Sequence, residues 1–167
     1  MTGNGQVSPL NQENEEPLRL FVSYSHKDER YLKEFSAHMY PLLRTKKARQ
    51  WDDRAIDLGS EWELEIYREL EAADIVICFV SSDFIASDFC YTKELEIALN
   101  EHQLKKKLVI PIRLRSCVWD DLPLAKLQGI PKKWITSYTN KDKAWTEVVT
   151  NLRSLIISFE KSDEALK

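Results

Sequence analysis

Glycine is scarce in this sequence. Its 167 residues include four glycines, and Gly59 is the only one between positions 5 and 129. The first predicted strand therefore ends in a turn without glycine, Ser23-Tyr24-Ser25-His26-Lys27. Rossmann dinucleotide-binding turns and P-loops need glycine there, because the backbone must approach a phosphate closely. Both kinds of site are therefore excluded at this turn.

Long apolar runs and an excess of one charge are also missing. No stretch approaches the roughly 20 apolar residues of a membrane helix, and no signal-peptide pattern opens the chain. The net charge is −3, which gives no general electrostatic case for nucleic acid. The short basic runs at 105–107 and 132–133 are interpreted as solvated loops. We therefore expect a cytoplasmic protein without a membrane or nucleic-acid partner.

Cysteine and histidine are sparse as well. The three cysteines, Cys78, Cys90 and Cys117, are odd in number and widely spaced, which indicates free thiols in a reducing compartment. The three histidines are isolated from one another in the sequence: His26, His38 and His102. A metal site needs clustered ligands, so we expect no bound metal and interpret the histidines as surface or helix-face residues.

The most informative stretch begins with six apolar residues at 75–80. Such a run is typical of a central parallel strand that is buried on both faces. Polar residues end the strand, and Ser87 or Asp88 is in position to cap a following helix. Leu95 and Leu99 lie four residues apart on that helix, so both should face the sheet.

Strands and helices alternate along the rest of the chain. Strands are predicted at 18–24, 48–51, 75–80, 108–114 and 134–137. Apolar residues recur at helical spacing from Leu32 to Leu42, from Trp62 to Leu70 and from Trp145 to Ile156. Asp28 and Ser60 precede the first two helices as candidate N-caps. The fold class is therefore α/β, a flavodoxin-like three-layer sandwich with a five-stranded, mostly parallel sheet and helices on both faces.

Composition divides the chain into three parts. Residues 1–17 are polar and lack an apolar period, so we expect a disordered leader or a linker to a further domain or partner. The folded domain is expected at 18–158, and a polar tail follows at 159–167. Several folds share this alternation, so function has to come from the loops at the carboxyl ends of the strands. The acidic pair of a phosphoacceptor receiver domain and a nucleophile elbow are both absent from those loops.

Four motifs occur in the order that they have in one known family. They are Leu20-Phe21-Val22-Ser23-Tyr24-Ser25; Trp51-Asp52-Asp53-Arg54 through Gly59; Val80-Ser81 with Phe84, Ser87, Cys90 and Glu94; and the helix that carries Trp145. In this order they resemble the first strand, the BB loop, the third strand and helix, and the last helix of TIR (Toll/interleukin-1 receptor) domains of the prokaryotic type. The resemblance covers about residues 18–157.

The resemblance implies a cytoplasmic module for signalling or antiphage defence. Many TIR domains cleave NAD⁺ at the nicotinamide–ribose bond with one glutamate on the third helix, and the matching position here is Glu94. NAD⁺ would then be a substrate, and no cofactor is expected. Catalytic relatives often carry Trp four residues before the glutamate, where this chain has Cys90. Tyr91 is in position to supply a ring instead.

A carboxylate suits this reaction because the leaving nicotinamide departs as a neutral molecule. The difficult part is the oxocarbenium-like charge on the ribose, as in glycoside hydrolysis. At about 4 Å and an effective dielectric constant near 20, one carboxylate is worth roughly 4 kcal/mol to that charge. That energy corresponds to about a thousandfold in rate when it is gained in the transition state.

Further site residues follow by position. The expected substrate-binding residues are Tyr24, Ser25, Asp52, Asp53, Phe84 and Tyr91. The loop expected to mediate homotypic TIR–TIR assembly comprises Asp53, Arg54, Ala55, Ile56, Asp57, Leu58 and Gly59. Three readings stay open: an NAD⁺ glycohydrolase or cyclase that makes ADP-ribose, cyclic ADP-ribose or an isomer, a non-catalytic adaptor that acts through TIR–TIR contact, and a virulence factor that interferes with host TIR signalling.

Overall fold

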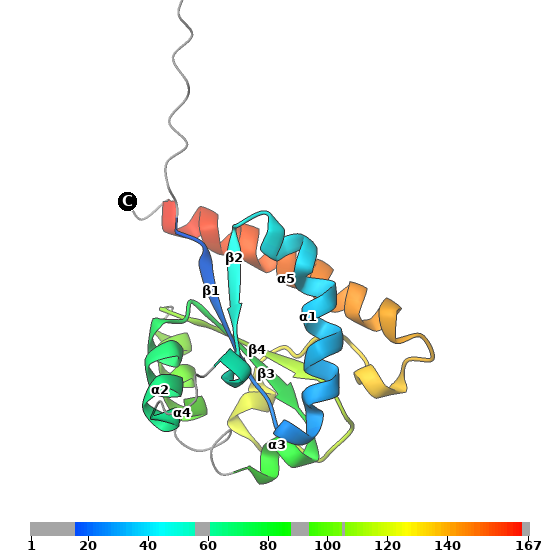
Figure 1. Cartoon of the computed structure of the whole chain (residues 1–167). Helices are drawn as coiled ribbons and strands as arrows, with labels where there is room; N and C mark the ends of the chain where they lie inside the picture. The colour runs from blue at the N-terminus through cyan, green and yellow to red at the C-terminus, as the bar shows by residue number, and fades with distance from the viewer. Residues whose placement is uncertain (1–15, 56–60, 88–93, 105, 165–167) are drawn as a thin grey trace, which may run out of the picture.

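The computed structural model describes residues 16–55, 61–87, 94–104 and 106–164, and of residues 94 and 160–164 it describes the backbone alone. A sheet of four parallel strands lies at its centre, in the order β2-β1-β3-β4 (Figure 1). The strands are β1 Leu18–Ser23, β2 Ala48–Trp51, β3 Ile75–Val80 and β4 Leu108–Arg113. These four strands confirm the sequence prediction to within one residue at each end. All six residues of β3 are buried, as the continuous apolar run predicts.

Helices follow the strands as the alternating pattern predicts. They are α1 Glu29–Arg44, α2 Trp62–Ala72, α3 Ser82–Ala86, α4 Glu94–Gln103 and α5 Lys141–Glu164. Short 3₁₀ turns are η1 His26–Asp28, η2 Asp53–Ala55, η4 Pro123–Lys126 and η5 Ile135–Ser137. None of the helices in the described part of the chain is long and apolar enough to cross a membrane.

Two layers of helix cover the sheet (Figure 1). Helices α1 and α5 lie together on one face, and α2 and α4 lie on the other. On the first face the buried ring of Phe35 lies 5.4 Å from Phe79 and 5.7 Å from Trp145. On the second face Ile66 of α2 and Leu95 of α4 join one buried cluster. Alternate residues of β3 serve the two faces, so one strand contributes to both halves of the core.

The predicted fifth strand at 134–137 is wrong. Ile135 is buried there, but it lies in the 3₁₀ turn η5, and within the described residues β4 is an edge strand. Beyond its pairing with β3, strand β4 forms a parallel bridge between Ile112 and Ile130. The edge position suits Pro111, because proline cannot donate a ladder hydrogen bond. The described sheet therefore has four strands.

Three helix details also differ from the prediction. Asp28 occupies the N-cap of α1, but its side chain makes no capping hydrogen bond. Trp62 was expected on the buried face of α2 and is 39% exposed, whereas Ile66 and Leu70 are buried as predicted. The proposed cap at Ser60 lies outside the described residues. Helix α5 continues to Glu164, within the segment expected to be a polar tail.

Candidate functional site

The carboxyl ends of β1 and β2 open into a pocket of about 310 Å³. Its described lining is Phe21, Val22, Ser23, Tyr24, Ser25, His26, Lys27, Trp51, Asp53, Trp62, Ile66 and Ser87. These residues come from the end of β1 and the turn after it, the end of β2 with η2, the first turns of α2, and the end of α3. Ligands of open parallel sheets bind outside the carboxyl ends of the strands, and this pocket lies there.

Aromatic side chains contribute to the lining of the pocket. The rings of Phe21 and Trp51 stack with their centroids 5.2 Å apart and 20° between their planes. Trp62 also lines the pocket, with its ring centroid 6.5 Å from that of His26 and 72° between the ring planes. Rings placed in this way offer flat apolar surfaces with a polar rim, which suits an aromatic heterocycle.

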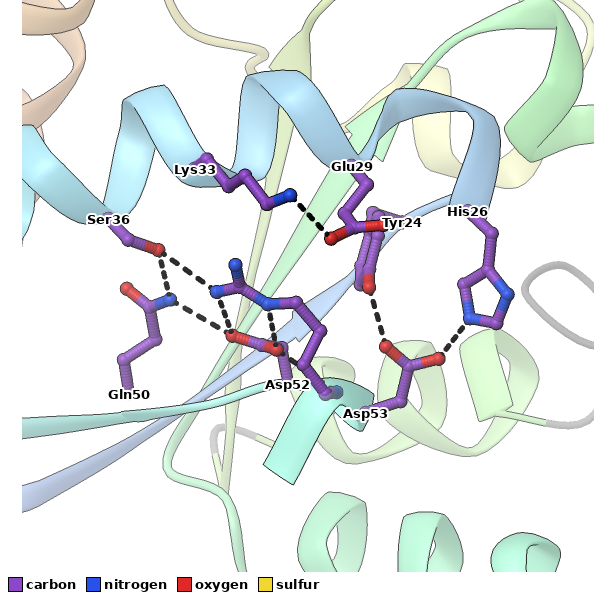
Figure 2. A network of polar contacts seen from close by, with 9 residues as sticks. Tyr24, His26, Glu29, Lys33, Ser36, Gln50, Asp52 and Asp53 are labelled. Carbon is purple, nitrogen blue, oxygen red and sulfur yellow. Dashed lines mark hydrogen bonds and ion pairs between the residues drawn. The ribbon is translucent and has the colours of Figure 1, made fainter. Parts of the chain in front are cut away.

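The Asp53 carboxylate, which lines the pocket, is contacted by two side chains, Tyr24 and His26 (Figure 2). The Tyr24 hydroxyl donates to Asp53 Oδ1 at 2.7 Å, and His26 Nε2 contacts Asp53 Oδ2. Tyr24 is 5% exposed. This burial, and then the hydrogen bond to Asp53, raise the pKa of Tyr24 well above its usual value. Both effects favour the protonated phenol, which is the form that donates to Asp53.

The neighbouring carboxylate, Asp52, serves a different network (Figure 2). Arg54 donates to it from Nε at 2.7 Å and from Nη2 at 3.0 Å, which is a bidentate pair. Gln50 Nε2 adds a contact of 3.3 Å to Asp52 and donates to Ser36 of α1 at 2.8 Å. Asp52 is 7% exposed and is not part of the described pocket lining. It fixes the start of the loop after β2 against α1.

A third polar cluster ties the turn after β1 to the loops after β3 and β4. Asp28 is 1% exposed and accepts from Arg115 Nε at 2.7 Å and from Ser81 Oγ at 2.5 Å. Arg115 also bonds Asp83 on α3, and Asp83 pairs with the pocket residue Lys27 at 2.9 Å. These cations lower the pKa of Asp83, Lys27 most strongly and then Arg115. The cluster holds three loops of the carboxyl edge together.

The catalytic candidate Glu94 is the first residue of α4. Its side chain lies outside the described residues, but the next residue, Leu95, is 4% exposed. Leu95 belongs to the same buried cluster as Phe21 and Ile66, and both of these line the pocket. The backbone of α4 therefore begins next to the buried cluster that supports the pocket.

The structure brings together three of the six predicted substrate-binding residues, Tyr24, Ser25 and Asp53. Phe84 is fully buried in the core and does not line the described pocket, and Asp52 faces Arg54. Tyr91 lies outside the described residues. Of the expected assembly loop, Asp53, Arg54 and Ala55 form η2, and Ile56, Asp57, Leu58 and Gly59 lie outside the described residues.

Sequence reasoning did not assign His26, Lys27, Trp51 or Trp62 to the site. A usable signal existed for His26 and Lys27, because both directly follow the carboxyl end of the first strand. Trp62 was assigned to the core because it fits the apolar spacing of α2. Within the described residues no three His, Cys, Asp or Glu side chains lie close enough together to hold a metal ion.

A doubly wound parallel sheet with a pocket at its carboxyl edge defines the class of protein. The sequence profile of the TIR domain matches residues 20–135, so the chain belongs to the TIR domain family. The chain is also 36% identical over 136 residues to the uncharacterized protein y4lF of Sinorhizobium fredii (strain NBRC 101917 / NGR234). That match covers 80% of this chain and 42% of the relative, so the chain spans about two fifths of its length.

Solved TIR domains have the same fold. The TIR domain of the Toll-related receptor TRR-2 from Hydra magnipapillata is similar with a TM-score of 0.57 and 18% identity, covering 80% of this chain and 97% of that one. The TIR domains of the activated Roq1 resistosome, which recognises the pathogen effector XopQ, are similar with a TM-score of 0.55 and 15% identity. That match covers 80% of this chain and 98% of the other.

Proposed function

We propose that this chain is an NAD⁺ glycohydrolase or cyclase that cleaves the nicotinamide–ribose bond. The observation that carries the proposal is the aromatic-walled pocket at the carboxyl ends of β1 and β2, with the Asp53 carboxylate among its lining residues. Family membership supports the same reading. So does the start of α4 at Glu94, because Leu95 packs against the cluster behind the pocket.

The pocket suits one half of a dinucleotide. Its volume of about 310 Å³ is at the lower end of the range for small-molecule sites. The rings of Trp51 and Trp62 offer apolar faces to the nicotinamide, and Asp53 offers an acceptor for ribose hydroxyls. We assign the nicotinamide–ribose end to this pocket.

The chemistry asked of the chain is charge stabilisation. Nicotinamide leaves as a neutral molecule, so its departure needs no proton donor in the pocket. Glu94 is proposed to stabilise the positive charge on the ribose. This charge grows as the bond to nicotinamide breaks. Water or the adenine of the same molecule then attacks the ribose carbon, which gives ADP-ribose or a cyclic product.

A pair of variants on one helix tests the proposal. Glu94→Gln removes the proposed charge, and Glu96→Gln is the matched control, since Glu96 is exposed two residues along α4. Nicotinamide release from NAD⁺ is measured at high protein concentration, with products resolved by chromatography. We expect a loss of about a thousandfold for Glu94→Gln and little change for Glu96→Gln. Equal rates for both variants would refute the role of Glu94.

A non-catalytic adaptor is the second candidate. The observation that favours it is a pair of apolar side chains on α2, Leu64 at 41% and Tyr67 at 49% exposure. Side chains of this kind at a surface are common in protein–protein contacts. The adaptor reading predicts that neither wild type nor Glu96→Gln consumes NAD⁺, even at concentrations where the chain self-associates.

A further inference from the structure

The loops after β1 and β2 meet through one side chain, Asp53. Its carboxylate is bonded on one oxygen by the Tyr24 hydroxyl, at 2.7 Å, and on the other by His26 Nε2 (Figure 2). A carboxylate only accepts hydrogen bonds, so both partners donate. Two donors on different oxygens fix the carboxylate against rotation about its terminal bond.

The two donors are held in different ways. Tyr24 is packed in the core, and the whole residue is 5% exposed. The His26 side chain is 68% exposed, whereas that of Asp53 is 13% exposed. Packing therefore sets the position of Tyr24 and contributes little to that of His26. The described polar contact that holds the His26 ring at the pocket is its bond to Asp53.

We propose that His26 is a positioning residue of this pocket, which acts by holding the Asp53 carboxylate, and through it the start of the loop after β2, in place for the substrate. This inference rests on the proposed function. His26 also lines the pocket, with its ring centroid 5.8 Å from that of Tyr24 and 6.5 Å from that of Trp62. One exposed ring therefore connects the end of β1, η2 and the first turn of α2.

The proposal separates binding from chemistry. Asp53 lines the pocket and its carboxylate is held by Tyr24 and His26, so this order lowers the cost of binding the ground state and the transition state alike. Loss of such an interaction raises KM and leaves kcat nearly unchanged. Loss of the proposed charge at Glu94 acts on kcat instead. The two residues therefore give opposite kinetic signatures.

Four variants test the proposal. His26→Ala removes the donor, and His26→Gln keeps an N–H at nearly the same reach as Nε2. His38→Ala is the matched control, because His38 makes a comparable pair with Asp142, at 3.2 Å, on the side of α1 and α5. Asp53→Ala gives the reference state without the carboxylate. For each, KM and kcat for NAD⁺ are measured together with the NMR shift of the Tyr24 ζ-carbon, which reports hydrogen bonding of the hydroxyl.

For His26→Ala we expect KM to rise about tenfold, the effect of one hydrogen bond to a charged group, with kcat within about twofold. His26→Gln should restore most of the affinity, and His38→Ala should match wild type. The Tyr24 shift should move toward the Asp53→Ala value in His26→Ala only. An unchanged KM, or an unchanged Tyr24 shift, in His26→Ala overturns the proposal. If wild type cleaves no NAD⁺, the proposed function fails, and the Tyr24 shift still decides the role of His26.

Discussion

Replacing Arg115 by glutamine should destabilise the fold strongly, although the Arg115 side chain is 29% exposed. The substitution removes the cation from Asp28, whose side chain is 1% exposed, and leaves that buried carboxylate with the Ser81 hydroxyl as its remaining described donor. Breaking a buried ion pair from one side costs about 3–5 kcal/mol, because the remaining charge stays buried. Solvent reaches the guanidinium here, and Ser81 still donates, so we expect the lower end, about 3 kcal/mol.

A double-mutant cycle with Asp28→Asn isolates this effect. Urea unfolding gives the free energy for wild type, the two single variants and the double variant, with exposed Arg49→Gln as control. Because the double variant leaves no buried charge, its loss should be smaller than the sum of the single losses by at least about 1.5 kcal/mol. A loss below about 1 kcal/mol for Arg115→Gln, or additive losses, would refute the reasoning.

Two further predictions concern stability. The cations around Asp83 lower its pKa below the ordinary value of 3.8. The contribution of Asp83 to the free energy of unfolding is therefore present above that pH and is lost as the pH falls through the lowered folded value. Asp83→Asn should flatten the acid limb of a stability–pH curve measured by urea unfolding, and an unchanged limb contradicts this. Trp145→Phe removes the hydrogen bond from Nε1 to Glu34, 2.8 Å long, and opens space in the core; it should cost about 2–3 kcal/mol, whereas a thermal midpoint equal to wild type would count against it.

The alternation of strands and helices could be predicted because its signals are local. The continuous apolar run predicts β3, the helical spacing of apolar residues predicts α1 and α5, and the structure confirms these elements. The prediction was wrong at residues 134–137. One buried side chain, Ile135, fits both a short strand and a single 3₁₀ turn. The local backbone hydrogen bonds from Ser137 N to Trp134 O and from Tyr138 N to Ile135 O identify the turn, and no sequence period predicts them.

The site was harder to predict than the fold, because several of its contacts join residues far apart in the sequence. Asp28 looks like a helix cap in the sequence, but its partner Arg115 lies 87 residues away and takes the carboxylate into another network. Asp52 and Asp53 are adjacent and chemically alike, yet the turn η2 directs one to Arg54 and the other to the pocket. No sequence period encodes that choice. The family resemblance pointed to the loops after β1 and β2, and the contacts of the individual residues follow only from the geometry.

Nicotinamide is proposed to bind in the pocket between the ends of β1 and β2 and the start of α2. The most direct test is a crystal structure of the Glu94→Gln variant with NAD⁺, since this variant should bind the substrate without turning it over. We expect the nicotinamide ring to lie against Trp51 or Trp62, and the adjoining ribose to lie within hydrogen-bond distance of Asp53. A nicotinamide bound elsewhere on the chain, or an empty pocket at millimolar NAD⁺, would contradict it.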